Sequence, residues 1–325
     1  MAIFTINWDE TPPALCRQGA LAIGNLDGVH RGHVALVTEL RQRARALGGP
    51  AVALTFDPPP LRLLRPDQCQ PPLSTIADRA DLLQAHGADH VVVLRTTANL
   101  LHLRARAFFD EVVRGRFAAR GLVEGSNFGF GRDREGDVAT LRVLCQDAGL
   151  DLVVLPPVRT DDGLPVSSGR IRSALLRGDV GVASNLLGRL YRLRGTVVTG
   201  QRRGQSLGFP TANLGEVATL IPRDGVYAVG VALEGAKWPG AANVGPNPTF
   251  GEQARKIEVH LIGFHGDLYG RALAVEFIRR LRDTRKFAGA AALAEQLRAD
   301  IEEARRVTGL WQALGQGSAL PCRFL

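Results

Sequence analysis

The sequence predicts two domains of different class. Residues 1–185 are expected to form a doubly wound parallel α/β domain, and residues 186–307 a small antiparallel β-barrel with a C-terminal helix. In the first part, short apolar runs alternate with helical patterns, which is typical of a buried parallel sheet. After residue 187, glycine becomes frequent, helical periodicity disappears and short alternating runs follow turn signals, which favours a closed barrel.

The α/β part contains apolar runs expected to be strands, separated by amphipathic segments expected to be helices. The strands are predicted at Leu21–Gly24, Ala51–Phe56, His90–Leu94, Leu122–Glu124 and Leu152–Leu155, and the helices at Val34–Leu47, Thr75–His86, Ala105–Ala119 and Val138–Ala148. Ligands of doubly wound sheets bind beyond the carboxyl ends of the strands. We therefore expect the functional residues in the loops that follow the strands.

The barrel part contains further strand candidates and a last helix. The strands are predicted at Tyr191–Val198, Val226–Leu233, Ala241–Val244, Lys256–Phe264 and Leu273–Phe277, and the helix at about Ala290–Val307. Residues 308–325 combine mixed polarity with Pro321, which predicts a loose tail.

Composition narrows the class of protein. The chain has no run of eighteen apolar residues and no signal-peptide pattern, so we expect no membrane segment. Its cysteines show no metal-ligand spacing, which predicts a reduced, cytoplasmic protein without disulfides. The net charge of +8 comes mainly from arginines spread along the chain. This favours small polyanions such as ATP over nucleic acid as partners.

The loop after the first predicted strand carries the strongest signal. Residues Gly24–His33 read GNLDGVHRGH and lead directly into a helix. Free backbone N–H groups and the helix dipole favour a bound phosphate at such a point. His30 and His33 are three residues apart and so share one face of the first turn, while Gly32 leaves room for a ligand near the backbone. We interpret this loop as a nucleotide-phosphate site.

Three more loops follow predicted strands. Thr55–Pro60 is proline-rich and must be rigid and extended. Glu124–Gly131 contains three glycines and two phenylalanines, which suits a loop around a flat aromatic ligand. Val166–Arg172 opens a helix that ends near Gly178. Its serines can cap that helix, and together with arginine they also make a phosphate site.

In the barrel part, Gly200–Gly208 forms a glycine-rich stretch that runs into Phe209–Leu214. The chain contains no Walker A sequence, but a glycine-rich arch can bind triphosphate through backbone donors. Thr211 and Asn213 carry oxygens two residues apart, which suits Mg²⁺. In the alternating run Ile257–Leu261, Glu258 is either a solvated strand residue or a catalytic group.

Taken together, these motifs resemble one known family. GNxDGVHxGH resembles the HxGH signature of nucleotidylyltransferases, in the form found in prokaryotic bifunctional riboflavin kinase/FMN adenylyltransferases, also called FAD synthetases. The DPP, SNFGFG and SSGRIR stretches resemble that family's TFxPHP, GxDFxFGxxRxGD and SSTxIR motifs. GQSLGFPTAN, NVGPNPTF, EVHL and GDLYG are similar to its riboflavin kinase motifs, so the resemblance covers about residues 14–305.

The resemblance implies a Rossmann-like nucleotidylyltransferase domain followed by a riboflavin kinase barrel. It implies ATP as co-substrate, Mg²⁺ as cofactor, and FMN and FAD as products. Glu258 is the implied base of the kinase, and His30 and His33 are the implied catalytic residues of adenylyl transfer. It also implies that the histidine motif and the SSGRIR motif, some 135 residues apart, meet at one sheet edge.

The implied binding residues fall into three groups. The nucleotide-binding set is Gly24, Asn25, Asp27, Gly32, Asn127, Ser167, Ser168, Arg172, Gly200, Gly204, Gly208, Pro210, Thr211 and Asn213. The flavin-binding set is Asp57, Pro58, Phe128 and Phe130, and the metal-binding set is Thr211 and Asn213.

Two alternatives stay open. Pro59, Gly169 and Gln205 replace the family's usual histidine, threonine and arginine. These departures favour a flavin-binding module in which one active site, most readily the adenylyltransferase, is impaired. The chain could also be a nucleotidylyltransferase that acts on pantetheine or choline phosphate, although such an enzyme has no use for a riboflavin-kinase-like barrel.

Overall fold

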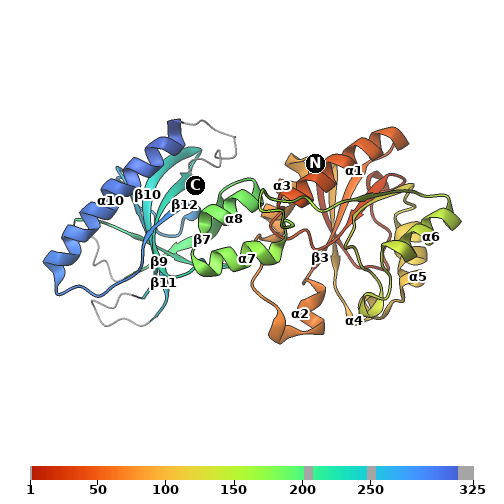
Figure 1. Ribbon diagram of the computed structural model, residues 1–325, viewed down its shortest axis with the longest axis horizontal. Coiled ribbons are helices and arrows are strands. Elements are labelled where there is room, and N and C mark those ends of the chain that lie inside the picture. The colour runs from red at the N-terminus through yellow and green to blue at the C-terminus, as the bar shows by residue number, and fades with distance from the viewer. Residues whose placement is uncertain (1, 201–207, 247–253, 314–325) are drawn as a thin grey trace. The chain divides into compact units, whose positions relative to one another are not determined.

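The computed structural model describes residues 2–200, 208–246 and 254–313 (Figure 1). The chain divides into two compact units. The first holds residues up to Gln70 and Ser74–Ser167, and the second holds Pro71–Leu73 and the chain from Ser168 onwards. The first is an α/β unit and the second a closed barrel with a C-terminal helix, so the predicted fold class is confirmed.

The first unit is built on a six-stranded parallel sheet. In the order β1-β4-β3-β2-β5-β6, its strands are Ala2–Ile6, His90–Arg95, Ala51–Asp57, Ala20–Ile23, Gly121–Gly125 and Asp151–Leu155. The five predicted strands are present, and the edge strand β1 is an addition. The chain winds outwards from β2 through β3 to β4, then returns to β5 on the other side of β2. The topological switch point, where such sheets bind ligands, therefore lies between β2 and β5.

Helices cover both faces of this sheet. The main ones are α1 (Arg31–Leu47), α3 (Ile76–Ala85), α6 (Val138–Ala148) and α5 (Ala105–Ala107), which continues as the π-helical segment η3 (Phe108–Arg116). The four predicted helices are thus present. The short helices are α2 (Pro60–Leu64), α4 (Ala98–His102), η1 (Ala14–Cys16), η2 (Pro66–Gln68) and η4 (Arg132–Arg134).

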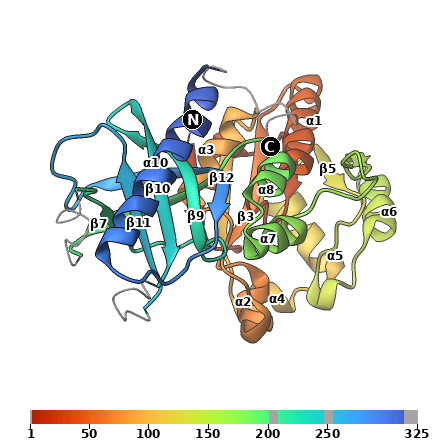
Figure 2. The ribbon, with the colours of Figure 1, turned by 60° about the vertical axis from the view of Figure 1, so that its left-hand side comes forward.

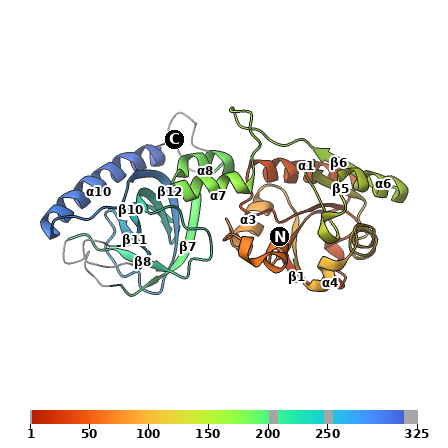
Figure 3. The same ribbon diagram turned by 60° about the horizontal axis from the view of Figure 1, so that its bottom comes forward.

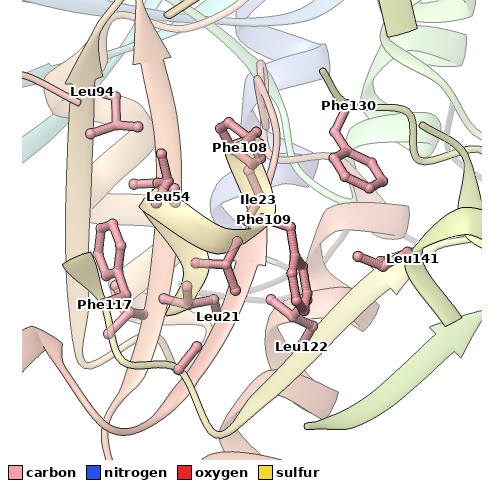
Figure 4. Close-up of a cluster of buried hydrophobic side chains, with 14 of the residues drawn as sticks. Leu21, Ile23, Leu54, Leu94, Phe108, Phe109, Phe117, Leu122, Phe130 and Leu141 are labelled. Atoms are coloured by element: carbon pink, nitrogen blue, oxygen red, sulfur yellow. The ribbon is translucent and has the colours of Figure 1, made fainter. Parts of the chain in front are cut away.

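Alternation along β2 divides the core into two layers. Leu21 and Ile23 pack with the aromatic residues of η3 on one face (Figure 4). Ala20 and Ala22 pack with residues of α1 and α3 on the other. Because these alanines are small, α1 can lie close to β2.

The second unit is a six-stranded barrel of antiparallel strands (Figure 3). Round the barrel, the strands are β10 (Ala236–Gly245), β11 (Lys256–Leu261), β8 (Ala212–Gly215), β7 (Tyr191–Val198), β12 (Ala272–Arg282) and β9 (Gly225–Leu233). The five predicted strands are present, and the short β8 is an addition.

The described helices that accompany the barrel are α7 (Ser168–Arg177), α8 (Val180–Leu187) and α10 (Ala290–Ala313). Helix α10 lies along the outside of the barrel and packs Ile301, Ala304 and Val307 against it (Figure 2). It extends beyond the predicted end at Val307, and residues 314–325 lie outside the described part. The predicted domain boundary after residue 185 stays a prediction. Among the described helices, none is both long and apolar enough to cross a membrane.

Candidate active sites

The loop between β2 and α1 has an unusual backbone. Leu26, Gly28 and Val29 all have positive φ angles, of 47°, 78° and 39°. This conformation is strained for leucine and above all for β-branched valine. Leu26 and Val29 are buried in the core beneath the loop. Apolar packing therefore contributes to holding a conformation that the backbone alone disfavours.

His30 and His33 form a compact pair at the end of this loop. His30 is the N-cap of α1, and its Nδ1 accepts a hydrogen bond from the backbone N–H of His33 at 3.3 Å. The two rings stack with centroids 3.6 Å apart and planes 16° from parallel. They lie on one face of the first turn, as their spacing predicts. A Cβ at Gly32 would lie 3.1 Å from Cε1 of His30, so the glycine also leaves room for this ring.

Asp27 lies inside the loop, where protein groups surround it. Its Oδ1 accepts hydrogen bonds from the backbone N–H and the hydroxyl of Ser74, each at 3.1 Å, and from Nη2 of Arg79 at 3.1 Å. The Ser74 hydroxyl in turn accepts the N–H of Gly28 at 3.0 Å. Sequence reasoning missed Ser74 and Arg79, because these contacts join segments about fifty residues apart. The predicted nucleotide-binding role of Asp27 stays a prediction.

The loop after β3 lies at the same edge of the sheet. A cis peptide bond joins Asp57 to Pro58. Thr96, which follows β4, donates its N–H to the carbonyl of Asp57 at 3.0 Å and its hydroxyl to that of Pro58 at 2.5 Å. The Asp57 side chain is exposed, so it is accessible to a ligand at the carboxyl end of β3.

The loop after β5 brings its two phenylalanines together. Phe128 and Phe130 stack with centroids 5.4 Å apart and planes 15° from parallel. Phe130 is buried beside Phe108 in the core, whereas Phe128 is half-buried. Of the two rings predicted to bind flavin, Phe128 is thus the more accessible. Asn127 is exposed, and its backbone carbonyl accepts a hydrogen bond from Arg134.

A buried carboxyl group lies at the switch point. The β2–β5 ladder pairs Ala20 with Gly121 and Leu21 with Leu122. Beyond it, Oε1 of Glu124 accepts the backbone N–H of Ile23 at 2.8 Å. Burial raises the pKa of Glu124 well above its ordinary value, although the bond from Ile23 opposes the shift. Glu124 therefore keeps its proton to a higher pH than an exposed glutamate does, a property that the sequence pattern did not signal.

The third predicted phosphate motif lies at the start of α7. Ser167 and Ser168 are half-buried there. Nε of Arg172 donates to the carbonyl of Pro71 at 3.3 Å. That this motif meets the histidine pair stays a prediction.

In the barrel, two predicted site residues and one residue of the NVGPNPTF motif lie in one row across adjacent strands. Glu258 on β11 is directly opposite Asn213 on β8, and Asn243 on β10 is directly opposite Glu258. Residues paired in this way share a face and bring their side chains within reach of one another. A Cβ at Gly200 would lie 2.1 Å from Nδ2 of Asn213, so the glycine-rich stretch begins against this row.

The residues before Asn213 are fixed by the same strand. Nδ1 of His260 is 2.8 Å from the carbonyl oxygen of Pro210, and its ring makes an edge contact with Phe209. Thr211 then follows with an exposed side chain. Gly208 has a φ of 83°, which favours glycine, and the predicted Gly204 lies outside the described residues.

Comparisons with known proteins match both units. A family model described as "FAD synthetase" matches residues 13–170, and one described as "Riboflavin kinase" matches residues 187–308. The chain is 39% identical to the bifunctional riboflavin kinase/FMN adenylyltransferase of Pseudomonas fluorescens, over 87% of this chain and 91% of that protein. The Escherichia coli K12 protein of the same name is 34% identical, over 94% of this chain and 96% of its own length.

A solved structure has the same fold. The crystal structure described as a macrolide-efflux protein from Streptococcus pneumoniae superposes with a TM-score of 0.84 and 32% identity, covering 94% of this chain and 99% of that one. Two family models in succession and relatives that match nearly end to end identify the whole chain. It belongs to the bifunctional riboflavin kinase/FMN adenylyltransferase family.

Proposed function

We propose that this chain makes FAD in two ATP-dependent steps at two sites. The barrel unit phosphorylates riboflavin to FMN, and the α/β unit adenylylates FMN to FAD with release of pyrophosphate. One observation carries the proposal. In the unit that the FAD synthetase model matches, His30 stacks on His33 at a helix N-terminus, and in the unit that the riboflavin kinase model matches, Glu258 is paired with Asn213.

In the adenylyl step, the phosphate of FMN attacks the α-phosphate of ATP in line. A new P–O bond forms, the bond to pyrophosphate breaks, and the anionic nucleophile needs no general base. Because Nδ1 of His30 accepts a hydrogen bond, the neutral ring carries its proton on Nε2, which is therefore a donor. This donor, His33 and the N-terminus of α1 offset the charge that develops on the departing pyrophosphate.

In the kinase step, Glu258 accepts the proton of the ribityl 5′-hydroxyl as that oxygen attacks the γ-phosphate of ATP. Thr211 and Asn213 offer the hydroxyl and amide oxygens that suit Mg²⁺. Within the described residues, no cluster of three His, Cys, Asp or Glu could hold a metal ion. These two side chains and the ATP phosphates would be the ligands of Mg²⁺, because oxygen is the ligand atom that it prefers. Bound Mg²⁺ supplies positive charge that offsets the charge on the phosphates.

The remaining assignments follow from exposure. The exposed Asp57, with Pro58, and the half-buried Phe128 are the flavin contacts of the α/β unit, and Phe130 supports Phe128 from the core. Cys16, Cys69 and Cys145 are free thiols, which is consistent with a cytoplasmic enzyme. Its partners are small molecules: riboflavin, FMN and ATP.

The test is product analysis over time with riboflavin, ATP and Mg²⁺. We expect FMN to appear first and FAD to follow. Glu258→Gln should abolish FMN formation yet leave adenylylation of supplied FMN intact, and loss of both activities would contradict two separate sites. FMN without FAD would show that the adenylyl site is impaired. If neither product forms and supplied FMN is not adenylylated, the protein is a binding module.

A further inference from the structure

The loop that presents His30 needs support from outside itself. Leu26 and Val29 hold positive φ angles that their side chains disfavour, and both flank Asp27 and Gly28. A loop of this kind keeps its conformation only where its surroundings fix it. Apolar packing fixes Leu26 and Val29 from below. The polar groups of the loop need hydrogen-bonding partners.

Arg79 supplies that support from the first turn of α3. Its Nη2 donates to Asp27 Oδ1 at 3.1 Å, and its Nη1 donates to the Thr55 hydroxyl at 3.1 Å. Thr55 passes the connection on by donating to the carbonyl of Asn25 at 3.0 Å. One guanidinium thus fixes the loop at two points, through the carboxylate of Asp27 and through the backbone of Asn25.

Ser74 adds a third point. It donates to Asp27 and accepts the N–H of Gly28, and Nε of Arg79 lies 3.5 Å from its hydroxyl. The ion pair at the centre is buried, with 4% of the Arg79 side chain and 9% of the Asp27 side chain exposed. Buried charges depend strongly on the geometry of their partners, so this pair tolerates little displacement.

We infer that Arg79 is a positioning residue for adenylyl transfer, which touches no substrate but sets the shape of the loop that binds the ATP phosphates. This inference rests on the proposed adenylyl site. Without Arg79, Asp27 and Asn25 lose their common anchor. His30, three residues after Asp27, and the N-terminus of α1 then lose their fixed position. The barrel unit carries its own site, so riboflavin phosphorylation does not depend on this network.

Other residues of α3 hold this helix against the core, so the role of Arg79 can be distinguished from packing. Ala80 and Leu83 are the apolar residues of α3 that are fully buried in the core. Arg79 instead makes polar bonds to the loop and to the end of β3. Its removal should therefore change catalysis in this unit more than it changes the packing of α3.

The experiment measures both activities in the same full-length preparations. The variants are Arg79→Met, Arg79→Lys and Thr55→Val. Arg43→Met is the matched control, because Arg43 is an arginine of α1 that bonds Glu39 and whose side chain is 42% exposed. For adenylylation of supplied FMN, we measure kcat, KM for ATP and KM for FMN. Riboflavin phosphorylation reports the amount of folded barrel unit, and a denaturant titration of each variant reports whether the α/β unit is folded.

For Arg79→Met we expect kcat/KM for ATP in adenylylation to fall about 100-fold, the loss that a misplacement of roughly 1 Å can cause. Riboflavin phosphorylation and KM for FMN should stay within about twofold of the wild type. Arg79→Lys should lose about tenfold, because one ammonium group cannot reproduce the planar fork that bonds two partners. Thr55→Val, which breaks only the branch to Asn25, should lose less than Arg79→Met.

A wild-type value of kcat/KM for ATP in Arg79→Met would overturn the inference. Equal losses of adenylylation and riboflavin phosphorylation in all three variants would also overturn it. If Arg79→Met does not fold, Arg79→Lys and Thr55→Val decide the matter, and wild-type values for both would overturn the inference. A wild-type chain that forms FMN but does not adenylylate it would overturn the proposed adenylyl step and this inference with it. If the wild-type chain adenylylates FMN and the variants have the same kcat/KM for ATP, the inference about Arg79 is overturned and the proposed adenylyl step stands.

Discussion

Gly32→Ala should reduce adenylyl transfer with only a small loss of stability. Gly32 is the second residue of α1, where an alanine favours the helix by at most about 1 kcal/mol. The new Cβ would lie 3.1 Å from Cε1 and 3.2 Å from Nδ1 of His30, closer than ordinary contact. His30 is buried, caps the helix and stacks on His33, so it has little freedom to yield.

The magnitudes favour a large kinetic effect and a small thermodynamic one. Crowding a packed site costs about 1–3 kcal/mol, and the helix gain offsets part of it. We therefore expect the unfolding free energy of the α/β unit to fall by about 0–2 kcal/mol. A donor displaced by a few tenths of an ångström loses alignment with the developing charge, and we expect kcat of adenylylation to fall by about 10- to 100-fold.

The assay compares Gly32→Ala with Gly309→Ala. Gly309 also lies in a helix, α10, but nothing lies within 4 Å of where its Cβ would be. Both variants are measured for unfolding, for riboflavin phosphorylation and for adenylylation of supplied FMN. Gly309→Ala should leave both activities unchanged. Wild-type adenylylation by Gly32→Ala would refute the reasoning, because it would show that the position of His30 is not critical.

Two further changes probe the buried carboxyl group of Glu124 and the barrel site. Folding raises the pKa of Glu124 above its ordinary value of 4.5, so its contribution to stability is complete below about pH 4.5 and is lost as pH rises towards the folded pKa, at about 1.4 kcal/mol per pH unit. Glu124→Gln should therefore gain stability over the wild type above pH 4.5 in denaturant titrations, and a difference that does not change with pH would contradict this. Gly200→Ala would place a Cβ 2.1 Å from Nδ2 of Asn213, so it should reduce riboflavin phosphorylation and raise the Mg²⁺ concentration required, while adenylylation is unchanged. Normal riboflavin phosphorylation in Gly200→Ala would contradict the assignment of Asn213 as a ligand of Mg²⁺.

The sequence predicted the elements whose signals are local. Strands β2 to β6 each contain a short apolar run, and α1 is an amphipathic helix after a turn. It missed β1 at the sheet edge, which alternates between half-buried and exposed residues, and β8, which is four residues long. It also placed the start of α1 at Val34 instead of Arg31, because a histidine cap has no apolar periodicity.

The candidate sites show the same limit. The pair of His30 and His33 followed from spacing, and so did the shared face of Glu258 with its strand neighbours. The burial of Phe130 beside Phe108 could not be predicted, because either phenylalanine of the loop could have turned to the core. No local pattern signals the role of Arg79, since its partners Thr55 and Asp27 lie 24 and 52 residues away in the sequence.

The two sites depend on different kinds of order, and this decides which changes each tolerates. Glu258 and Asn213 face one another because of strand register, so shifting β11 by one residue would replace Glu258 with a buried apolar neighbour. A single side-chain change elsewhere in the barrel leaves that register in place. The histidine loop has no ladder to fix it, and its shape depends on a buried ion pair and on two strained residues held by packing. Substitutions of residues that support this loop without touching the ligand should therefore impair adenylyl transfer far more readily than equivalent changes in the barrel impair riboflavin phosphorylation.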